Sequence, residues 1–522
     1  MNQLNESSVV EIIQINTIYR VNPAAVFHKI CGDKKLSLLL ESAEINKKNQ
    51  LKSMMIIDTA IRITAYNRKV VLQSFSKNGQ NILEKMSSVI PKTVLVHYHS
   101  ESLTLIFPTS VSTLDEDVKL RELSIFDCFR FILKLLKPNM LYENAIFFGG
   151  LFSYDLVSTF EPLPIIPSIH QCPDFCFYLS EVLLIMDHLN QTSVLQGSVF
   201  FQDKHEKLRI TQRMLNIKNE LKNKPKSITN FKIPYSAVKM NFSDEEYKKI
   251  VRDMQLYIQS GEIFQVVPSR KFFLPCPYPL SAYYTLKLNN PSPYMFFMQD
   301  IDFTIFGASP ESALKYNPEN RKIEIYPIAG TRPRGFDQDG QLDLDLDSRI
   351  ELEMRTNQKE LSEHIMLVDL ARNDLAKICI PGTRFVSQLT KVDRYSHVMH
   401  LVSKVVGKLQ YDLDALHAYS ACMNMGTLTG APKIRAMQII SEVEKVKRGS
   451  YGGAIGYFTG FGTLDTCIII RSAYVENQIA VIQAGAGIVL DSIPNEESIE
   501  SKNKAQVVLN SIIQSNYKKD IL

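Results

Sequence analysis

The stretch TCIIIRSAYVENQIAVIQAGAG (466–487) sets the fold class, because two runs rich in apolar residues flank a polar pair. Each run is long enough for a β-strand, and Glu476-Asn477 between them suits a tight turn. The stretch therefore predicts a β-hairpin. Arg471 lies inside the first run, where a guanidinium among apolar neighbours needs a partner, and a carboxylate that binds it with two hydrogen bonds is the natural one.

The segments before this hairpin favour strands as well. IRITAYNRKVVLQSF (61–75) predicts two short strands around Asn67-Arg68, and AIFFGGLFSYDLV (145–157) predicts an apolar strand broken at Gly149-Gly150. We therefore expect an α+β protein whose large, mostly antiparallel sheets pack as a sandwich with flanking helices.

A strong helix signal begins near residue 243. Ser243 and Glu246 form a capping box ahead of apolar residues at helical spacing, and Gly261 is a plausible stop. Just upstream, NELKNKPKSITNFKIPYS (219–236) is rich in Lys, Asn and Pro and suits a linker. The sequence thus predicts an N-terminal subdomain (1–220), a linker (221–240) and a catalytic domain (241–522).

The composition excludes several classes of protein. Hydrophobic residues make up 45% of the chain and charged residues 22%, as in an ordinary globular protein, and the net charge of +4 is spread without a basic stripe. We find no signal peptide, no apolar run of membrane-spanning length, and no disulfide or zinc spacing among the eight cysteines. We expect a reduced, cytoplasmic protein that binds neither nucleic acid nor membrane.

Two E-x-x-E pairs are the first candidates for chemistry. Glu360 and Glu363 lie in KELSEHIMLVDLARND (359–374), and Glu497 and Glu500 lie in NEESIESKNKAQVVL (495–509). Helical spacing places each pair on one stripe beside an apolar face. Each pair alone is typical of a solvated helix face, whereas four carboxylates from two helices can also close on a hard divalent cation such as magnesium.

A third acidic segment, DLDLDS (343–348), carries Ser348 and Met354 where an EF-hand requires glycine and glutamate. It is interpreted as a solvated acidic loop.

Several glycine-rich segments predict close approach of the backbone to a ligand. GTLTGAPKIRAMQII (426–440) lacks the spacing of a nucleotide-binding loop but leads Lys433 into a helix start, where an anion is favoured. YPIAGTRPRG (326–335), RGSYGGAIGY (448–457) and QAGAGIVL (483–490) add further glycines and arginines. Together these segments predict a pocket for a small ligand that bears carboxylates.

These blocks, in this order, resemble those of the chorismate-utilising enzymes, and most closely the large subunits (component I) of anthranilate synthases. The likeness covers nearly all of 243–515. It implies the family's fold and the Mg²⁺-dependent conversion of chorismate and ammonia into anthranilate and pyruvate, a lyase reaction that opens tryptophan biosynthesis. Nothing in the chain resembles a glutaminase, so a separate glutamine amidotransferase subunit (component II) is expected to supply ammonia.

The resemblance also assigns roles by position. Glu363 and Glu500 are expected to bind Mg²⁺, with Glu360 and Glu497 holding it through water. His400 is expected to act in eliminating pyruvate, and Glu311 to protonate the departing hydroxyl, with a pKa raised by burial near other carboxylates. The expected catalytic loop residues are Thr427 and Lys433. The expected chorismate contacts are Gly330, Thr331, Tyr451, Arg471, Gly485, Ala486 and Gly487.

Two further segments, LLLES (38–42) and NPSPYMFF (290–297), resemble the family's feedback site for L-tryptophan. The expected effector contacts are Glu41, Ser42, Pro293, Tyr294 and Met295. In addition, Gln265 stands where water-adding relatives carry a lysine base, which favours ammonia as the nucleophile.

Two alternatives remain open. The same fold also makes 4-amino-4-deoxychorismate for folate (aminodeoxychorismate synthase component I). A catalytically inactive regulatory or nucleic-acid-binding protein is favoured only by a pI near 8.4. His400 on an apolar strand is also compatible with a purely structural role.

Overall fold

The computed structural model describes residues 10–42, 51–109, 115–137, 142–168, 171–223, 237–337, 339–395 and 398–517. Two long strands, β3 (Lys52–Tyr66) and β8 (Phe175–Asp187), pair along their length, and the sheet extends from them in two branches. All strand pairs in this part of the chain are antiparallel, as the hairpin sequence predicts.

The first branch leaves β3. Its strands in spatial order are β2 (Ser37–Glu41), β13 (Tyr294–Gln299), β14 (Thr304–Ser309), β23 (Ser472–Glu476), β24 (Ile479–Gly485), β12 (Ser269–Pro275) and β10 (Lys239–Met240). The second branch leaves β8. Its strands are β7 (Phe147–Phe152), β21 (Ala454–Thr459), β22 (Leu464–Ile468), β15 (Ser312–Asn317), β16 (Lys322–Ile325) and β19 (Val398–Lys408), which also pairs with β17 (Ile328–Pro333) and β18 (Phe385–Arg394).

The remaining strands extend the sheet near the N-terminus or form a short ribbon. They are β1 (Glu11–Thr17), β4 (Lys69–Ser74), β5 (Leu95–Tyr98), β6 (Ser102–Ile106) and β9 (Thr192–Val199), with β11 (Gln265–Val266) and β20 (Gly430–Ala431) as a separate pair.

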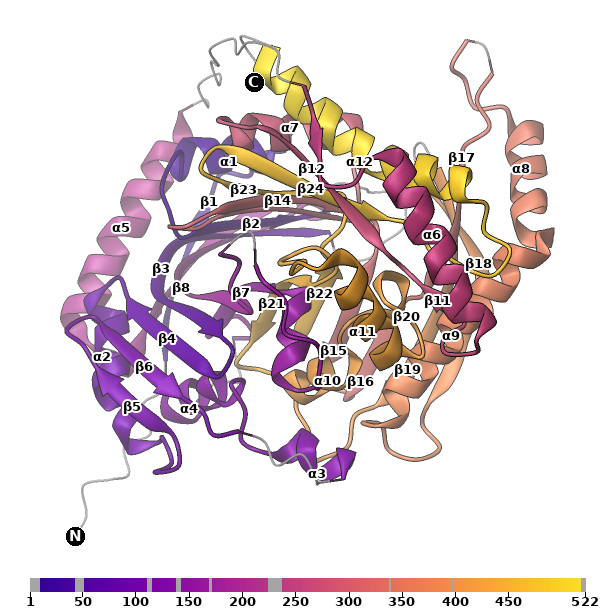
Figure 1. Ribbon diagram of the computed structural model, residues 1–522. Coiled ribbons are helices and arrows are strands. Elements are labelled where there is room, and N and C mark those ends of the chain that lie inside the picture. The colour runs from indigo at the N-terminus through magenta and orange to yellow at the C-terminus, as the bar shows by residue number, and fades with distance from the viewer. Residues whose placement is uncertain are drawn as a thin grey trace.

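Helices cover the outer faces of the two branches (Figure 1). They are α1 (Pro23–Ile30), α2 (Lys77–Lys85), α3 (Glu116–Arg121), α4 (Asp127–Leu136), α5 (Lys204–Lys222), α6 (Asp244–Gln259), α7 (Pro279–Asn289), α8 (Leu344–Thr356), α9 (Gln358–Ala376), α10 (Ala415–Cys422), α11 (Lys433–Glu444) and α12 (Pro494–Tyr517). Four 3₁₀ turns complete the described elements: η1 (Met86–Ser88), η2 (Tyr154–Thr159), η3 (Phe200–Gln202) and η4 (Gly426–Leu428).

Apolar side chains from both branches meet in one buried cluster. Leu38 and Ile305 come from the first branch, and Leu151 and Ile455 come from the second. A separate core lies between the first branch and helices α1, α5, α7 and α12. The predicted α+β sandwich with flanking helices is therefore confirmed.

The predicted hairpin is present as β23 and β24, and its turn falls at Asn477 and Gln478, both with positive φ. One strand prediction was wrong: β7 runs unbroken through Gly149-Gly150. The glycines are required by close packing rather than by a break, since a Cβ on Gly150 would lie 2.1 Å from the carbonyl oxygen of Cys176. The two strands around Asn67-Arg68 are also present, but β3 is long rather than short.

The helix signals have mixed outcomes. The capping box of Ser243 and Glu246 opens α6 as predicted. The interpretation of residues 343–348 as a solvated loop was wrong, because Asp343 caps the N-terminus of α8 and Asp347 is buried. An acidic residue at a helix start is stabilised by the helix dipole, which a count of charges alone does not show.

The proposed domain boundary stays a prediction. Residues 224–236 of the expected linker lie outside the described residues, between the end of α5 and β10. Strands from the two halves of the chain do pair directly, since β2 bonds β13 and β7 bonds β21.

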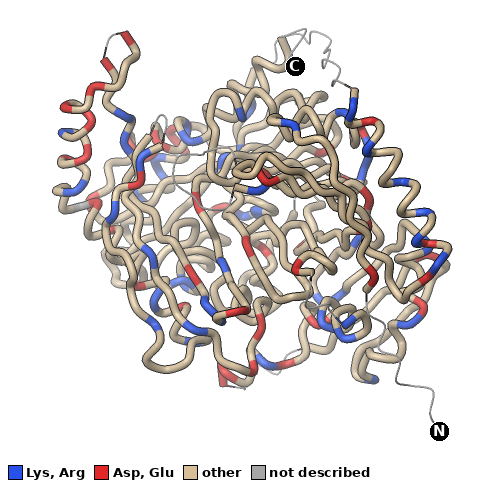
Figure 2. Tube along the Cα trace, turned by 180° about the vertical axis from the view of Figure 1, so that it is seen from behind, with Lys and Arg blue, Asp and Glu red and all other residues tan. Residues whose placement is uncertain are grey.

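Charged residues are interspersed on the face shown in Figure 2, where Lys and Arg alternate with Asp and Glu. In the part of the chain that the structure describes, no helix is long and apolar enough to cross a membrane.

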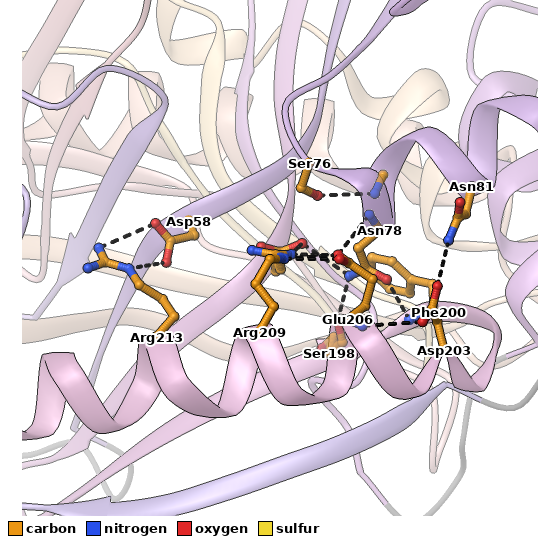
Figure 3. Close-up of polar contacts among 12 residues, drawn as sticks. Asp58, Ser76, Asn78, Asn81, Ser198, Phe200, Asp203, Glu206, Arg209 and Arg213 are labelled. Carbon is orange, nitrogen blue, oxygen red and sulfur yellow. Dashed lines mark hydrogen bonds and ion pairs between the residues drawn. The ribbon is translucent and has the colours of Figure 1, made fainter.

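Helix α5 is fixed to the sheet by a buried polar network (Figure 3). The Asn78 amide on α2 donates to Glu181 at 3.2 Å and to the Ser198 carbonyl at 2.9 Å, and its own oxygen accepts from the Phe200 N–H at 2.8 Å. Arg209 on α5 pairs with both Glu181 and Glu206. These bonds connect α2, β8, β9 and α5, so they stabilise the outer edge of the sandwich.

Replacing Asn78 with alanine should lower the free energy of unfolding by about 3 kcal/mol, because it leaves several buried groups without partners. The matched control is Asn81→Ala on the same helix, whose amide makes one 3.4 Å bond to Asp203 and should cost less than about 1 kcal/mol. Urea denaturation measures both. Equal losses for the two variants would contradict the importance of the network.

Candidate active site

His400 and Thr331 face each other across neighbouring strands. The β17–β19 register pairs them, and the Thr331 hydroxyl lies 2.9 Å from His400 Nδ1. Burial, aided by the positive charge of Arg471, lowers the pKa of His400 to about 4. His400 is therefore neutral at physiological pH and can accept a proton.

Arg471 occupies the turn between β22 and β23 rather than the interior of a strand, with a positive φ of 49°. No described residue makes a hydrogen bond or ion pair with its side chain, so the predicted carboxylate partner does not come from the described part of the chain. Burial lowers the pKa of Arg471, opposed by the charges of Tyr451 and Glu500, so both groups are near it. The guanidinium is left available for an anionic ligand.

Tyr451 completes the wall beside Arg471. Its hydroxyl accepts a hydrogen bond from the Gly485 N–H, and burial raises its pKa to about 12. Lys504 on α12 donates to the Gly485 carbonyl at 3.1 Å and pairs with Glu500 at 2.6 Å. Hydrogen bonds and an ion pair thus connect the Tyr451 phenol, the glycine segment at the end of β24 and the start of α12.

A buried ion pair that sequence reasoning missed supports this wall. Arg448 pairs with Glu444 at 2.5 Å and donates to the carbonyls of Leu428 and Val267, both at 2.7 Å. It therefore fixes η4 and the segment before β12 relative to Tyr451. Only the neighbouring glycines marked this segment in the sequence, and they gave no sign of the Glu444 partner.

The two E-x-x-E pairs lie on α9 and α12, as predicted. Among the described residues, no three His, Cys, Asp or Glu side chains gather closely enough to hold a metal ion. Instead the carboxylates pair with cations of the chain: Glu360 with Arg332 at 2.6 Å, and Glu500 with Lys504.

One carboxylate oxygen of the two E-x-x-E pairs, Glu360 Oε2, has no hydrogen-bond donor beside it among the described residues. Glu360 Oε2 is buried without a hydrogen bond, and a Cβ on Gly330, where φ is +69°, would lie 2.8 Å from it. A buried anionic oxygen against bare backbone fits a hard cation that carries much of its own water.

Glu311 is buried at the edge of a cavity that Thr427 also lines. Burial raises the pKa of Glu311 to about 8, against the opposing effects of Thr427, Lys504 and the Ile328 N–H. The predicted direction is confirmed, but its cause is desolvation alone, since no neighbouring carboxylate contributes. The Thr427 hydroxyl lies beside the Glu311 carboxyl and interacts with it.

Lys433 begins α11 as predicted, but an ion pair already engages its ammonium. Its Nζ donates to Asp374 at 2.6 Å and to the Cys422 carbonyl at 3.0 Å. Asp374 lines the cavity that contains Glu311, so Lys433 acts on that cavity through Asp374 rather than as a free cation.

The glycine segment after β24 is only partly open to a ligand. The Ala486 N–H bonds the Tyr247 hydroxyl at 3.2 Å, and the Ala486 side chain is buried against helix α6. A Cβ on Gly487 would lie 2.7 Å from Gln265 Nε2, and Gln265 Oε1 is buried without a partner. The Ala486 side chain therefore packs toward α6, and the predicted ligand contacts at Gly485 and Gly487 stay predictions.

The five predicted effector residues come together at the β2–β13 pair, where the register sets Glu41 opposite Met295. Glu41 is buried and bonded by the Tyr283 hydroxyl and, at 2.6 Å, by Lys287. The Tyr294 hydroxyl donates to Asp465 at 3.1 Å. Ser42 and Pro293 adjoin these strands in sequence.

Residues 91–510 match the model of the family described as chorismate binding enzyme. This chain belongs to that family. It is 60% identical over 508 residues to anthranilate synthase component 1 of Buchnera aphidicola subsp. Baizongia pistaciae, with 97% of each chain covered. It is 56% identical over 512 residues to anthranilate synthase component 1 of Escherichia coli K12, with 98% of each covered.

Two solved structures share the fold. Anthranilate synthase component I from Streptococcus pneumoniae TIGR4 superposes with a TM-score of 0.64 at 26% identity, covering 89% of this chain and 93% of its own. The menaquinone-specific isochorismate synthase of Escherichia coli gives a TM-score of 0.67 at 15% identity, covering 97% and 95%. The second likeness concerns fold alone.

The raised pKa of Glu311 makes a prediction about stability. Its carboxyl is neutral below about pH 4.5 whether the chain is folded or not, and the folded state loses stability as pH rises toward 8, where the buried group ionises. Glu311→Gln stays neutral, so it should melt at a higher temperature than wild type at pH 9 and at a similar temperature at pH 5. Thermal denaturation at both pH values tests this, and a pH-independent difference would contradict it.

Proposed function

We propose that this chain is the large subunit of an anthranilate synthase, a lyase that converts chorismate and ammonia into anthranilate and pyruvate. One observation carries the proposal: the Arg471 guanidinium has no anionic partner in the described chain, and it lies beside a neutral His400 and a glycine backbone. A ring acid whose carboxylate meets Arg471 fits this arrangement. The names of the relatives at 56–60% identity support the same reaction.

The proposed steps use two groups whose pKa values are shifted in opposite directions, Glu311 upward and His400 downward. Glu311 is protonated near neutral pH, so it can give its proton to the departing ring hydroxyl as ammonia adds to the ring. His400 is neutral, so it can take the ring proton as the enolpyruvyl C–O bond breaks and the ring becomes aromatic. The Thr331 hydroxyl holds the imidazole in orientation.

We further propose that the reaction needs Mg²⁺, held by Glu363 and Glu500 directly and by Glu360 and Glu497 through water. The unpartnered Glu360 oxygen beside Gly330 supports this set, and the lack of a three-residue cluster suits an ion whose remaining ligands are water and substrate. When bound, the ion would neutralise the substrate carboxylate and withdraw electrons from the ring. Arg332 and Lys504 balance the same carboxylates without it.

The nucleophile is proposed to be ammonia from a partner glutamine amidotransferase, which is consistent with a chain whose relatives are called component 1. Gln265 supports ammonia over water, because an amide beside Gly487 cannot deprotonate water as a lysine amine can. An amine nucleophile needs no such base.

We also propose feedback inhibition by L-tryptophan at the β2–β13 pair. A contact network leads from there toward the proposed acid. Tyr294 hydrogen bonds Ser312, the residue after Glu311, and shares Asp465 with Lys315, which binds that carboxylate at 2.9 Å. An effector that moves Tyr294 would therefore act on the strand that carries Glu311.

The second candidate, aminodeoxychorismate synthase component I, uses the same fold but leaves pyruvate elimination to a separate lyase. Incubation of the purified chain with chorismate, Mg²⁺ and ammonium distinguishes the two. The proposal expects fluorescent anthranilate and one equivalent of pyruvate. Accumulation of an aminated, non-aromatic intermediate without pyruvate would rule it out.

Replacing Glu500 with glutamine should raise the Mg²⁺ concentration for half-maximal activity by about tenfold or more, because it removes a charged oxygen ligand. Glu496→Gln, on the exposed first turn of the same helix, is the matched control. Titration of activity with Mg²⁺ measures both variants. Equal Mg²⁺ dependence in wild type and Glu500→Gln would remove this residue from the metal site.

Ser42→Phe should leave uninhibited activity intact and raise the inhibitory tryptophan concentration by about tenfold, since a bulky ring would overfill a site closed by β2 and β13. Inhibition curves with and without the substitution check this. Wild-type sensitivity in the variant would show that tryptophan binds elsewhere.

A further inference from the structure

Arg270 on β12 is the largest side chain that is completely buried in the described part of the chain, and it takes no part in the proposed reaction. Its guanidinium contacts helix α12, which carries Glu497 and Glu500. Nε donates to the Ser501 hydroxyl at 3.0 Å, and Nη2 donates to the Ser498 carbonyl at 2.6 Å. A charged group without access to water needs such partners, and here one turn of α12 supplies two of them.

Asp244, the first residue of α6, balances the charge of Arg270. Nη1 of Arg270 donates to Asp244 Oδ1 at 2.8 Å, and Lys502 of α12 donates to the other carboxylate oxygen. The hydrogen bonds from Lys502 and from Arg270 lower the pKa of Asp244 to about 2, so this carboxylate is charged at physiological pH. The contacts therefore join α6, β12 and α12 at one point.

The first turns of α12 depend on these polar contacts. From Ala505 onward the helix buries apolar side chains such as Val508 in the core that it shares with α7. Before Ala505 its buried residues are Glu497, Ser498 and Ser501, and none of them is apolar. A helix end with little apolar packing opens easily, so the bonds to the buried guanidinium are what hold this turn.

Helix geometry makes these bonds set the direction of the neighbouring carboxylates. Successive residues of an α-helix lie about 100° apart around its axis. Glu497 comes directly before Ser498 in the chain, and Glu500 stands in the same relation to Ser501. A rotation of this turn that moved either glutamate would therefore break the bonds to Arg270.

Arg270 is also connected to the glycine segment after β24. Its Cζ lies 4.8 Å from the centre of the Tyr247 ring, a cation–π contact. The Tyr247 hydroxyl donates to the Pro268 carbonyl at 2.9 Å and accepts from the Ala486 N–H at 3.2 Å. One buried residue thus connects the acidic turn of α12 to the backbone of residues 485–487.

We propose that Arg270 is a positioning residue that holds Glu497 and Glu500 in place relative to the glycine segment 485–487. The inference rests on the proposed function, in which these carboxylates hold a divalent cation. Lysine at this position keeps the charge but lacks the planar fork that bonds Asp244 and α12 at the same time. Arg270→Lys should therefore weaken cation binding and loosen the first turns of α12 without unfolding the rest of the helix.

The test measures binding rather than turnover. Mn²⁺ replaces Mg²⁺ as a probe that electron paramagnetic resonance detects, with chorismate present and ammonia absent. In Arg270→Lys the dissociation constant for Mn²⁺ should rise by about tenfold, as expected when the support of a metal ligand is lost. Hydrogen exchange without metal should be faster than in wild type for the amides of residues 497–501 and unchanged from Ala505 onward.

Arg62→Lys is the matched control, because Arg62 on β3 is also largely buried and binds Asp300 with two hydrogen bonds, of 3.0 and 2.6 Å. It should lose similar stability and keep the wild-type affinity for Mn²⁺. Ser501→Ala keeps the test valid if Arg270→Lys does not fold. It removes one bond to Arg270 and no charge, and should raise the dissociation constant for Mn²⁺ by about threefold.

Wild-type Mn²⁺ affinity and wild-type exchange in Ser501→Ala and in folded Arg270→Lys would overturn the proposal. An equal loss of Mn²⁺ affinity in Arg62→Lys would also overturn it, because the effect would then reflect lost stability in general. If wild type binds no Mn²⁺ in the presence of chorismate, the proposed metal site itself has failed. That result is distinct, since hydrogen exchange at residues 497–501 still decides whether Arg270 holds this turn.

Discussion

The candidate site is organised around one half-buried guanidinium, Arg471, to which no described residue gives an anionic partner. Arg471 sits in the turn between β22 and β23, with φ in the left-handed region that arginine rarely adopts. The strands on either side fix that turn, since β22 pairs with β15 and β21 while β23 pairs with β14 and β24. The pairings of β22 lie in the second branch of the sandwich, and the pairings of β23 lie in the first. Stability from the whole sheet thus holds a strained residue where a ligand can reach it.

The position of Arg471 also affects the protonation of the groups around it. Burial, aided by the positive charge of Arg471, lowers the pKa of His400, and burial raises the pKa of Tyr451 to about 12. The acidic residues of α9 and α12 are balanced by Arg332 and Lys504, while Glu311, farther into the core, keeps its proton by burial. An acid with a raised pKa and an imidazole with a lowered one therefore lie in one structure, a pattern typical of sites that move protons at neutral pH.

Features with a local cause could be predicted from the sequence. The hairpin turn near 476–478, the capping box at Ser243 and the helical placement of both E-x-x-E pairs each depend on neighbouring residues, and the structure contains them. The first strand predicted within 466–487 is instead divided into the end of β22 and β23. Gly149-Gly150 misled because a glycine in a strand is compatible with a break and with close packing. Only the position of the Cys176 carbonyl in the structure shows that close packing is the reason here. Residues 343–348 misled because three aspartates in six residues suggest a solvated loop, whereas Asp343 caps the N-terminus of α8 and Asp347 is buried.

Most of the candidate site could be recognised only from the three-dimensional structure. Lys433 pairs with Asp374 and Glu360 pairs with Arg332, in each case across separate segments of the chain, and no spacing rule indicates which cation meets which carboxylate. Arg471 showed the limit most clearly. Its sequence context called for a carboxylate partner, and only the structure shows that no described residue supplies one. The family resemblance identified the candidate residues, and the structure shows how burial shifts the pKa of Glu311 and of His400.

The most direct test of the central claim is the affinity of chorismate for Arg471→Gln, measured by isothermal titration calorimetry without ammonia so that no turnover occurs. If the guanidinium is the anchor for the ring acid, the dissociation constant should rise by about 100-fold, the value expected for the loss of a charge-assisted bidentate contact. Arg332→Gln, which removes a guanidinium already paired with Glu360, should change it far less. Unaltered chorismate affinity in Arg471→Gln would contradict the account.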